Sequence, residues 1–351
     1  MSKFWTEAVR NAKPYIPGEQ LNQPNLLKLN TNENPYPPSP NVIKAINKEL
    51  GDSLRLYPTP SMDSLREAIG KNFKLNLENV FVGNGSDEVL AFSFMAFFER
   101  GSTIKYPSIT YSFYPVYANL FDLSVDEVTL EDDFTIDPKK LYNAPGGVIF
   151  PNPNAPTSLY LELEAIEDIL KNNPNNIVIV DEAYVDFAKA SAASLIDKYD
   201  NLLIIQTLSK SRALAGLRVG FALGQPDLIN ALIRIKDSFN SYPIDRLALV
   251  GAEAAIRDNI YFKEVTEKII HTREWTIKEM TSLGFDVLPS QANFMFMKHP
   301  NHNGEKLYEQ LKEANILVRH FNHSPIEDYL RITIGTDDEM KRLITFLKEI
   351  I

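Results

Sequence analysis

The feature that most constrains the fold is a series of short apolar runs that alternate with helical patterns between residues 63 and 224. The runs are VFVGN at 80–84, TIKY at 103–106, VDEVTL at 125–130, GVIF at 147–150, IVIV at 177–180, LLIIQT at 202–207 and VGFALG at 219–224. Most are continuously apolar, which is typical of strands that are buried on both faces. We therefore predict an α/β fold with a large three-layer α/β/α domain around a mostly parallel sheet.

The pattern changes on both sides of this series. Residues 11–40 are rich in Asn and Pro, which predicts an extended arm, and a helix follows at 41–51. After residue 225 the pattern is mainly helical, and strand-like segments return at 293–298 and 329–335, which predicts a smaller C-terminal α+β domain. We divide the chain into an arm (1–30), a segment that packs with the small domain (31–52), the large domain (53–249) and the small domain (250–351).

Charge and hydropathy argue against some classes of binding partner. Lys and Arg number 36 against 46 Asp and Glu, and the net charge of −10 argues against a general nucleic-acid or anionic-membrane surface. The most apolar helical stretch, VLAFSFMAFF at 89–98, is too short to span a bilayer, and the N-terminus has no apolar signal-peptide core. We expect a cytoplasmic protein.

The sequence offers few residues for metal binding and none for thiol chemistry. The chain has no cysteine, which excludes disulfides, thiolate nucleophiles and iron–sulfur clusters. His299 and His302, like His320 and His323, are spaced three apart in polar stretches, without a clear carboxylate to complete a metal site. We expect no metal and interpret these histidines as solvated loop residues.

Lys210 is the first candidate for chemistry. It stands between two serines in TLSKSRALAGLR, just after an apolar run that ends at Thr207. Ligands of open α/β sheets bind at the carboxyl ends of the strands. A lysine among small residues there can be partly desolvated, with its pKa lowered from about 10.4, and a neutral amine can form a Schiff base. The alternative for an isolated lysine is a solvated loop position.

Two other strand ends carry polar side chains. Asp181 in DEAY follows the run at 177–180, and it can cap a helix, ligate a metal or hold a proton on a ring nitrogen. GNGSDE at 83–88 joins a strand to a helix whose first amides can receive a phosphate. The alternative for this motif is a plain cap, with Ser86 at the N-cap and acidic residues complementing the helix dipole.

Together these residues form the set that pyridoxal phosphate (PLP) requires: a Schiff-base lysine, Arg218 for a phosphate, Asp181 for a pyridinium and Tyr184 for a phenolate. On these motifs the chain resembles the fold-type I PLP-dependent aminotransferases of the class II subgroup and, among them, the histidinol-phosphate aminotransferase family. DEAY and the SK…LAGLR spacing carry the resemblance most strongly. It extends over the chain through KPY at 13–15, LNTNENP at 29–35, LYP at 56–58, PSITYSFYPVYA at 107–118, PNPNAPT at 151–157, SQANF at 290–294, LVR at 317–319 and LRITIGT at 330–336.

The resemblance implies a role for each candidate residue. Lys210 would form the aldimine and move the proton from the substrate Cα, with Asp181 on the ring nitrogen and Tyr184 on the phenolic oxygen. The implied cofactor-binding residues are Gly85, Ser86, Asp87, Tyr111, Asn154, Asp181, Tyr184, Ser209, Lys210, Arg218 and, from the partner subunit of a homodimer, Tyr57. The implied substrate-binding residues are Tyr15, Asn154, Arg319 and Arg331.

The implied activity is transamination between L-histidinol phosphate and 2-oxoglutarate, which gives imidazole-acetol phosphate and glutamate in histidine biosynthesis. An aromatic amino-acid aminotransferase, a threonine-phosphate decarboxylase and a non-catalytic protein of the same fold are alternatives. A nicotinamide oxidoreductase is disfavoured, because Glu88 stands where the third glycine of a dinucleotide fingerprint belongs. The loop at 152–158 departs from the family pattern at Ala155 and Ser158 but keeps Asn154.

Overall fold

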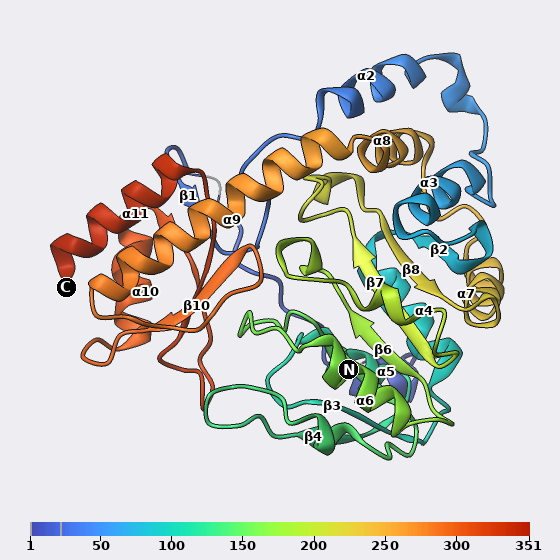
Figure 1. The fold of residues 1–351 in the computed structure, drawn as a ribbon, viewed down its shortest axis with the longest axis horizontal. Helices are drawn as coiled ribbons and strands as arrows, with labels where there is room; N and C mark the ends of the chain where they lie inside the picture. Colours follow the sequence, from blue (N-terminus) through green and yellow to red (C-terminus); the bar gives the residue numbers. More distant parts are fainter. Residues whose placement is uncertain (1, 22) are drawn as a thin grey trace.

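The computed structural model describes residues 2–21 and 23–351, and its largest element is a seven-stranded sheet in the order β2-β8-β7-β6-β5-β3-β4 (Figure 1). Its strands are β2 (Val80–Gly83), β3 (Thr103–Pro107), β4 (Ser124–Val128), β5 (Val148–Pro151), β6 (Val178–Asp181), β7 (Leu202–Thr207) and β8 (Gly220–Gly224). Strand β8 is antiparallel to both of its neighbours, and the pairs from β4 to β7 are parallel. The prediction of a mostly parallel sheet is confirmed.

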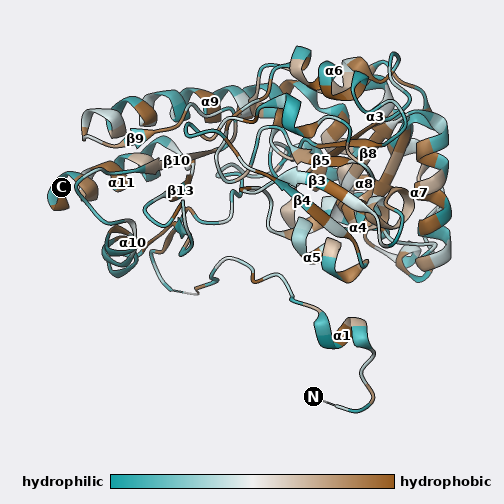
Figure 2. Ribbon diagram, turned by 90° about the horizontal axis from the view of Figure 1, so that it is seen from below, coloured by the Kyte–Doolittle hydropathy of each residue, from teal (hydrophilic) through white to brown (hydrophobic). Residues whose placement is uncertain are grey.

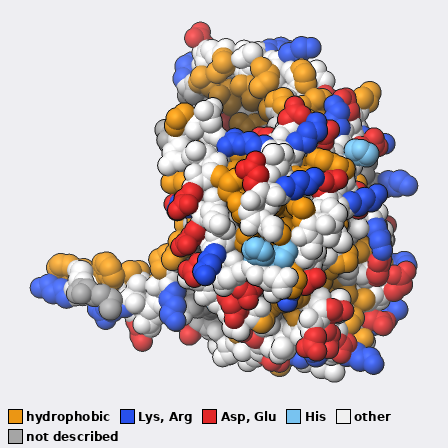
Figure 3. Space-filling model, turned by 90° about the vertical axis from the view of Figure 1, so that its left-hand side faces the viewer, with side chains coloured by type: hydrophobic (Ala, Val, Ile, Leu, Met, Phe, Trp, Pro, Cys, Tyr) orange, Lys and Arg blue, Asp and Glu red, His pale blue; other side chains and the backbone are white. Residues whose placement is uncertain are grey.

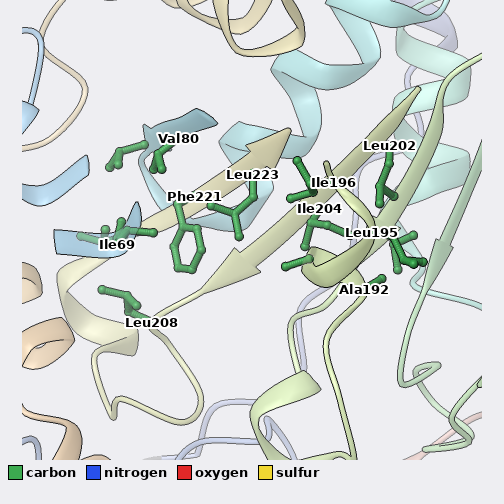
Figure 4. Close-up of a cluster of buried hydrophobic side chains, with 14 of the residues drawn as sticks. Ile69, Val80, Ala192, Leu195, Ile196, Leu202, Ile204, Leu208, Phe221 and Leu223 are labelled. Carbon is green, nitrogen blue, oxygen red and sulfur yellow. The ribbon is translucent and has the colours of Figure 1, made fainter. Parts of the chain in front are cut away.

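Helices cover both faces of this sheet. Successive side chains of each strand point in opposite directions, so a continuously apolar strand has apolar side chains to bury on both faces. Val178 and Val180 of β6 belong to one buried hydrophobic cluster, whereas Ile179 between them belongs to another. Figure 4 shows part of the first cluster, with Ile204 and Phe221 among its members. The first face is covered by α3 (Asp63–Phe73), α6 (Leu163–Lys171) and α8 (Arg246–Arg257), and the second by α4 (Gly85–Phe97), α5 (Phe113–Leu120) and α7 (Pro226–Phe239).

The C-terminal part forms a smaller unit with its own core. An antiparallel sheet in the order β12-β13-β10-β9 packs with three helices around a separate buried cluster, at the left of Figure 1. The elements are α9 (Asn259–Ser282), β9 (Asp286–Val287), β10 (Phe294–Lys298), α10 (Gly304–Glu313), β11 (Ile316–Leu317), β12 (Arg319–His320), β13 (Leu330–Thr333) and α11 (Asp337–Ile350). The predicted α+β character of this domain is confirmed.

The end of the predicted N-terminal arm packs against the small domain, which its Asn/Pro content does not predict. Strand β1 (Leu27–Lys28) pairs in parallel with β11, and Leu27 and Leu29 are buried in the small-domain cluster. Packing against an existing strand overrides the local preference for an open arm. Further upstream, Tyr15 stacks on Phe113 with ring centroids 4.3 Å apart, whereas the short helix α1 (Glu7–Asn11) buries no residue (Figure 2).

The segment 31–52 contacts both domains, not the small domain alone. Asn32 bonds to Thr333 of β13, whereas α2 (Pro40–Glu49) places Val42 in the large-domain cluster beside α8. Helix α8 contributes buried residues to that same cluster, and the predicted boundary at 249/250 falls inside it. We therefore propose to divide the chain between α8 and α9.

The surface carries mixed charge. On the face in Figure 3, Lys and Arg side chains are interspersed with Asp and Glu rather than gathered by sign. Within residues 2–21 and 23–351, no helix combines the length and apolar character needed to cross a membrane.

Gly220 allows β8 to lie against the start of α4. A Cβ built on Gly220 would lie 2.4 Å from the backbone nitrogen of Ser86, whereas a Cβ on Gly216 meets no atom within 4 Å. We predict that Gly220→Ala lowers the free energy of unfolding by about 1–3 kcal/mol or more, because backbone must move to admit the methyl group. Gly216→Ala should change it by less than about 1 kcal/mol. Urea unfolding midpoints of the two variants measure this, and equal midpoints would contradict the predicted close approach.

Candidate active site

A cavity of about 660 Å³ lies where the carboxyl ends of the central strands face the small domain. Most of the residues that the sequence singles out line it. They are Tyr15, Ser86, Asp87, Tyr111, Asp181, Tyr184, Ser209, Lys210, Arg218, Arg319 and Arg331. The fold thus brings together side chains from the N-terminal segment, the large domain and the small domain.

Lys210 reaches the cavity from the turn that follows β7. Its Nζ donates to the carbonyl oxygen of Thr31 at 3.1 Å, and no carboxylate forms an ion pair with it among the residues that the structure describes. Burial, followed by the nearby charge of Arg331, lowers the pKa of the Lys210 amine to about 8. The neutral fraction at neutral pH is therefore raised by about two orders of magnitude over a solvated lysine, which suits a nucleophile or a base.

Asp181 ends β6 next to this turn. Its side chain accepts hydrogen bonds from the Tyr114 hydroxyl at 3.1 Å and from the backbone of Ala183 at 3.2 Å. Burial nevertheless raises the pKa of the Asp181 carboxyl to about 7. A cationic ring nitrogen in the cavity would restore the charged form, because an opposite charge favours ionisation. The sequence did not single out Tyr114, although it lies within the quoted PSITYSFYPVYA motif.

An anion cradle forms at the N-terminus of α4. Asp87 lies 3.1 Å from the Arg218 guanidinium and accepts a hydrogen bond from Tyr111 at 2.8 Å. Gly85 has φ 77°, and a Cβ there would lie 2.5 Å from Arg218 Nη2, so a side chain would displace the guanidinium. Because helix N-termini and guanidinium groups both bind phosphate, this cradle fits a phosphate group.

Two guanidinium groups from the small domain share one aromatic ring. Arg319 and Arg331 lie 5.6 Å and 5.9 Å from the ring centroid of Phe321. Arg331 donates to the carbonyl oxygen of Asn30 at 2.9 Å, and its Nε is buried without a partner. Neither guanidinium has an ion-pair partner within residues 2–21 and 23–351. Two neighbouring cations without a counter-ion point to an anionic ligand.

Apart from Gly85, two predicted residues do not line the cavity. Tyr57 is 79% exposed and stacks on Tyr242, with ring centroids 4.7 Å apart. Asn154 donates from Nδ2 to the carbonyl oxygen of Ile109 and to Thr157 Oγ1, and its Oδ1 is buried without a partner. The neighbouring Ser158 has φ 65°, a left-handed conformation that a glycine adopts more readily.

The interpretation of the histidines as solvated loop residues is wrong for His320, which lies in strand β12 and lines the cavity, and for His299. His299 is 7% exposed, its Nε2 contacts the carbonyl oxygen of Leu283, and its ring lies edge-on to Phe285. Packing at the end of β10 explains its burial. No group of three metal-ligating side chains occurs among the described residues.

Comparison with known proteins settles the family. Residues 24–347 match the family model described as aminotransferase class I and II. The chain belongs to this family.

The most similar relatives include a histidinol-phosphate aminotransferase 1 of Oceanobacillus iheyensis, 56% identical over 100% of this chain and 99% of its own. Another is a histidinol-phosphate aminotransferase of Clostridium botulinum, 52% identical with the same coverage. Among solved structures, the histidinol-phosphate aminotransferase of Sinorhizobium meliloti in complex with pyridoxal-5'-phosphate has a TM-score of 0.88 at 23% identity, covering 100% of this chain and 99% of that chain. An aspartate aminotransferase of Thermus thermophilus, at 18% identity and full coverage of both chains, has a TM-score of 0.85. These structures show that the fold is fold type I.

Burial of Asp181 predicts a gain in stability when its charge is removed. Its pKa in the folded protein is about 7 against 3.8 in a solvated chain, so the folded state binds more protons between these values. Stability therefore falls as the pH rises through this window. At pH 8 and without cofactor, Asp181→Asn should increase the free energy of unfolding by about 1–3 kcal/mol, because the removal of the buried charge outweighs the loss of one of the two hydrogen bonds, from Tyr114 or from Ala183.

Asp132→Asn is the matched control, because Asp132 is exposed and forms no hydrogen bond or ion pair among the described residues. Denaturant unfolding at pH 4 and pH 8 measures both variants. A destabilised Asp181→Asn protein at pH 8 would contradict the unfavourable ionisation inferred for this carboxyl.

Proposed function

We propose that this chain is a PLP-dependent aminotransferase that exchanges the amino group between L-histidinol phosphate and 2-oxoglutarate. Relatives that are 52–56% identical over the full chain carry the name histidinol-phosphate aminotransferase. The observation that carries the substrate assignment is the Arg319–Arg331 pair without a counter-ion, beside a lysine whose pKa is lowered to about 8. An aromatic amino-acid aminotransferase or a threonine-phosphate decarboxylase is less supported, because these relatives carry the name histidinol-phosphate aminotransferase.

The residues present fit PLP. Ser86, Ser209 and Arg218 would hold its phosphate, and Tyr111 would face its ring from the cavity wall. Asp181 would pair with the ring nitrogen, and Tyr184 and Asn154 would bond its phenolic oxygen, with the unpartnered Oδ1 of Asn154 requiring a reorientation of that amide. When bound, PLP forms a Schiff base with an amine and accepts electrons from the substrate Cα.

The protein's own side chains supply the acid–base chemistry. Lys210 Nζ would remove the proton from the substrate Cα and return it to the aldehyde-derived carbon of the cofactor, which requires the neutral amine that burial favours. Asp181 would hold a proton on the ring nitrogen, since its carboxylate is unfavourable without a cation beside it. The ring of Tyr111 would orient the planar group between the cavity wall and the open side.

The two arginines would serve both half-reactions. Glutamate has two carboxylates, one of them on Cα, whereas histidinol phosphate carries a phosphate ester on the carbon attached to Cα and has no carboxylate. A guanidinium accepts either group through paired hydrogen bonds. Arg331 would bind the carboxylate of glutamate, and Arg319 with Tyr15 would bind the phosphate of histidinol phosphate.

The proposed assembly is a cytoplasmic homodimer with shared active sites. Tyr57 is exposed and lies away from the cavity of its own subunit, beside exposed Leu54, Leu56 and Tyr242. A second copy that covers this apolar surface would receive Tyr57 at its phosphate cradle. This geometry supports the role in trans that the sequence resemblance implies.

The activity is tested by the near-visible absorbance of the cofactor-loaded enzyme. Addition of histidinol phosphate should convert the band fully, and 2-oxoglutarate should restore it. Phenylalanine should react at least about tenfold less efficiently, because it carries a carboxylate in place of the phosphate ester and its phenyl ring cannot form the hydrogen bonds of an imidazole. Threonine phosphate should not be decarboxylated.

Lys210→Ala should bind PLP and lose nearly all of this turnover. Carbon dioxide release from threonine phosphate, or a preference for phenylalanine, would overturn the substrate assignment while leaving the cofactor in place. Absence of any near-visible band on a PLP-saturated wild-type protein would overturn both.

Mixed dimers test the sharing of the site. We predict that Lys210→Ala and Tyr57→Ala subunits, each impaired alone, regain activity when mixed, because one site of the mixed dimer then carries neither substitution. In a random equimolar mixture this amounts to roughly a quarter of wild-type activity. Steady-state transamination after subunit exchange measures the effect. If activity stays at the parental level although exchange is demonstrated by native mass spectrometry, Tyr57 acts within its own subunit.

A further inference from the structure

The short segment Asn30–Asn34 lines the cavity and contacts functional side chains of both domains. The carbonyl oxygen of Asn30 accepts a hydrogen bond from Arg331 at 2.9 Å, and that of Thr31 accepts from Lys210 at 3.1 Å. The next residue, Asn32, is 1% exposed and contacts a third functional side chain.

The amide of Asn32 has its orientation dictated by Thr333. The backbone N–H of Asn32 donates to Thr333 Oγ1 at 2.9 Å, and that hydroxyl donates in turn to Asn32 Oδ1 at 3.2 Å. Among the described residues the Thr333 hydroxyl proton has no acceptor other than Asn32 Oδ1, so the oxygen end of the amide faces Thr333 and the NH₂ end faces away. The backbone of Asn32 is left-handed, with φ 55°, and its carbonyl oxygen accepts from Asn293 at 3.0 Å. Asn is one of the few side chains that tolerate this conformation.

The NH₂ group of Asn32 donates to the Tyr184 hydroxyl at 2.9 Å. An amide NH₂ cannot accept a hydrogen bond, so the phenol oxygen is the acceptor in this pair. The phenol proton must therefore point elsewhere. No hydrogen bond donated by Tyr184 is found within residues 2–21 and 23–351, and Tyr184 lines the cavity. The proton is thus available to an acceptor in the cavity.

We infer that Asn32, held by Thr333, is a positioning residue that makes Tyr184 an obligatory hydrogen-bond donor to an oxyanion in the cavity. The inference rests on the proposed function, in which this acceptor is the phenolic oxygen of PLP. A tyrosine free to rotate would spend part of its time accepting rather than donating. The Thr333–Asn32 pair removes that alternative before the ligand arrives.

The arrangement also connects the phenol to the substrate-binding strand. Thr333 and Arg331 are alternate residues of β13, so their side chains leave the strand on the same face. Strand β13 would therefore bind the substrate anion through Arg331 and, through Thr333 and Asn32, determine that Tyr184 donates its hydroxyl proton into the cavity.

Two substitutions at Asn32 test the inference, and both tolerate a left-handed backbone. Asn32→Asp puts an acceptor where the donor stood, so Tyr184 would donate to the carboxylate instead of the cavity. Asn32→Gly removes the donor. The charged and titratable groups that face Tyr184 remain in both variants; they are Arg331, Asp181, Tyr15, Tyr111 and Lys210.

The measurement is a pH titration of the near-visible absorbance of the cofactor-loaded enzyme. A phenolic oxygen that loses its donor keeps more negative charge, which raises the proton affinity of the chromophore. The midpoint should rise by about one pH unit in Asn32→Asp and by less in Asn32→Gly, and the Kd for PLP should increase about tenfold in Asn32→Asp. Thr333→Val should shift the midpoint in the same direction.

Two comparisons separate positioning from a general structural effect. In a Tyr184→Phe background, Asn32→Gly should cause no further shift; an equal shift in both backgrounds would overturn the inference. Thr266→Val is the matched control for Thr333→Val, because the Thr266 hydroxyl is buried without a partner, and it should leave the midpoint unchanged. If the wild-type enzyme has a normal band and turnover but the midpoints of the variants do not shift, only this inference is refuted. If the wild-type protein lacks the band, the proposed function is refuted.

Discussion

The site depends on charged groups that burial removes from water and that the protein leaves without counter-ions. Burial lowers the pKa of Lys210 to about 8 and raises that of Asp181 to about 7, and it also lowers the pKa of Arg331. One opposite charge beside each group would offset the free-energy cost of burying its charged form. Backbone carbonyls and hydroxyls stand there instead. The arrangement is costly alone and becomes favourable with a ligand that carries a cation near Asp181 and anions near the arginines.

The direction of β8 makes this concentration of groups possible. Parallel strands β6 and β7 end at the same edge of the sheet, which brings Asp181 and Lys210 together. Strand β8 is antiparallel and starts at that edge, so Arg218, which precedes it by two residues, arrives at the same place. The end of β2 pairs with the start of β8, and the N-terminus of α4 follows directly. One reversed strand therefore adds both halves of the phosphate cradle to a parallel sheet.

Sequence patterns predicted the parts of this site that are local. An apolar run buried on both faces identifies a strand, and the polar residue that follows it lies at the carboxyl edge, as for Asp181 and Lys210. Contacts between distant segments were not predicted. Strand β1 consists of two residues and acquires its conformation from β11, and His299 is buried by packing at the end of β10. The division that we propose between α8 and α9 has no sequence signal, because only the packing of α8 assigns it to the large domain.

The same limitation explains why Asn32 attracted no attention. Its partner Thr333 is 301 residues away in the chain, and Tyr184 is 152 residues away. Nothing in the local sequence distinguishes an asparagine that turns a loop from one that orients a phenol. The segment that contains it bonds to β13 on one side and to Lys210 and Tyr184 on the other. Because the N-terminal segment contacts both domains, a shift of one domain relative to the other would also move Asn32 and so change the direction of the hydrogen bond at Tyr184.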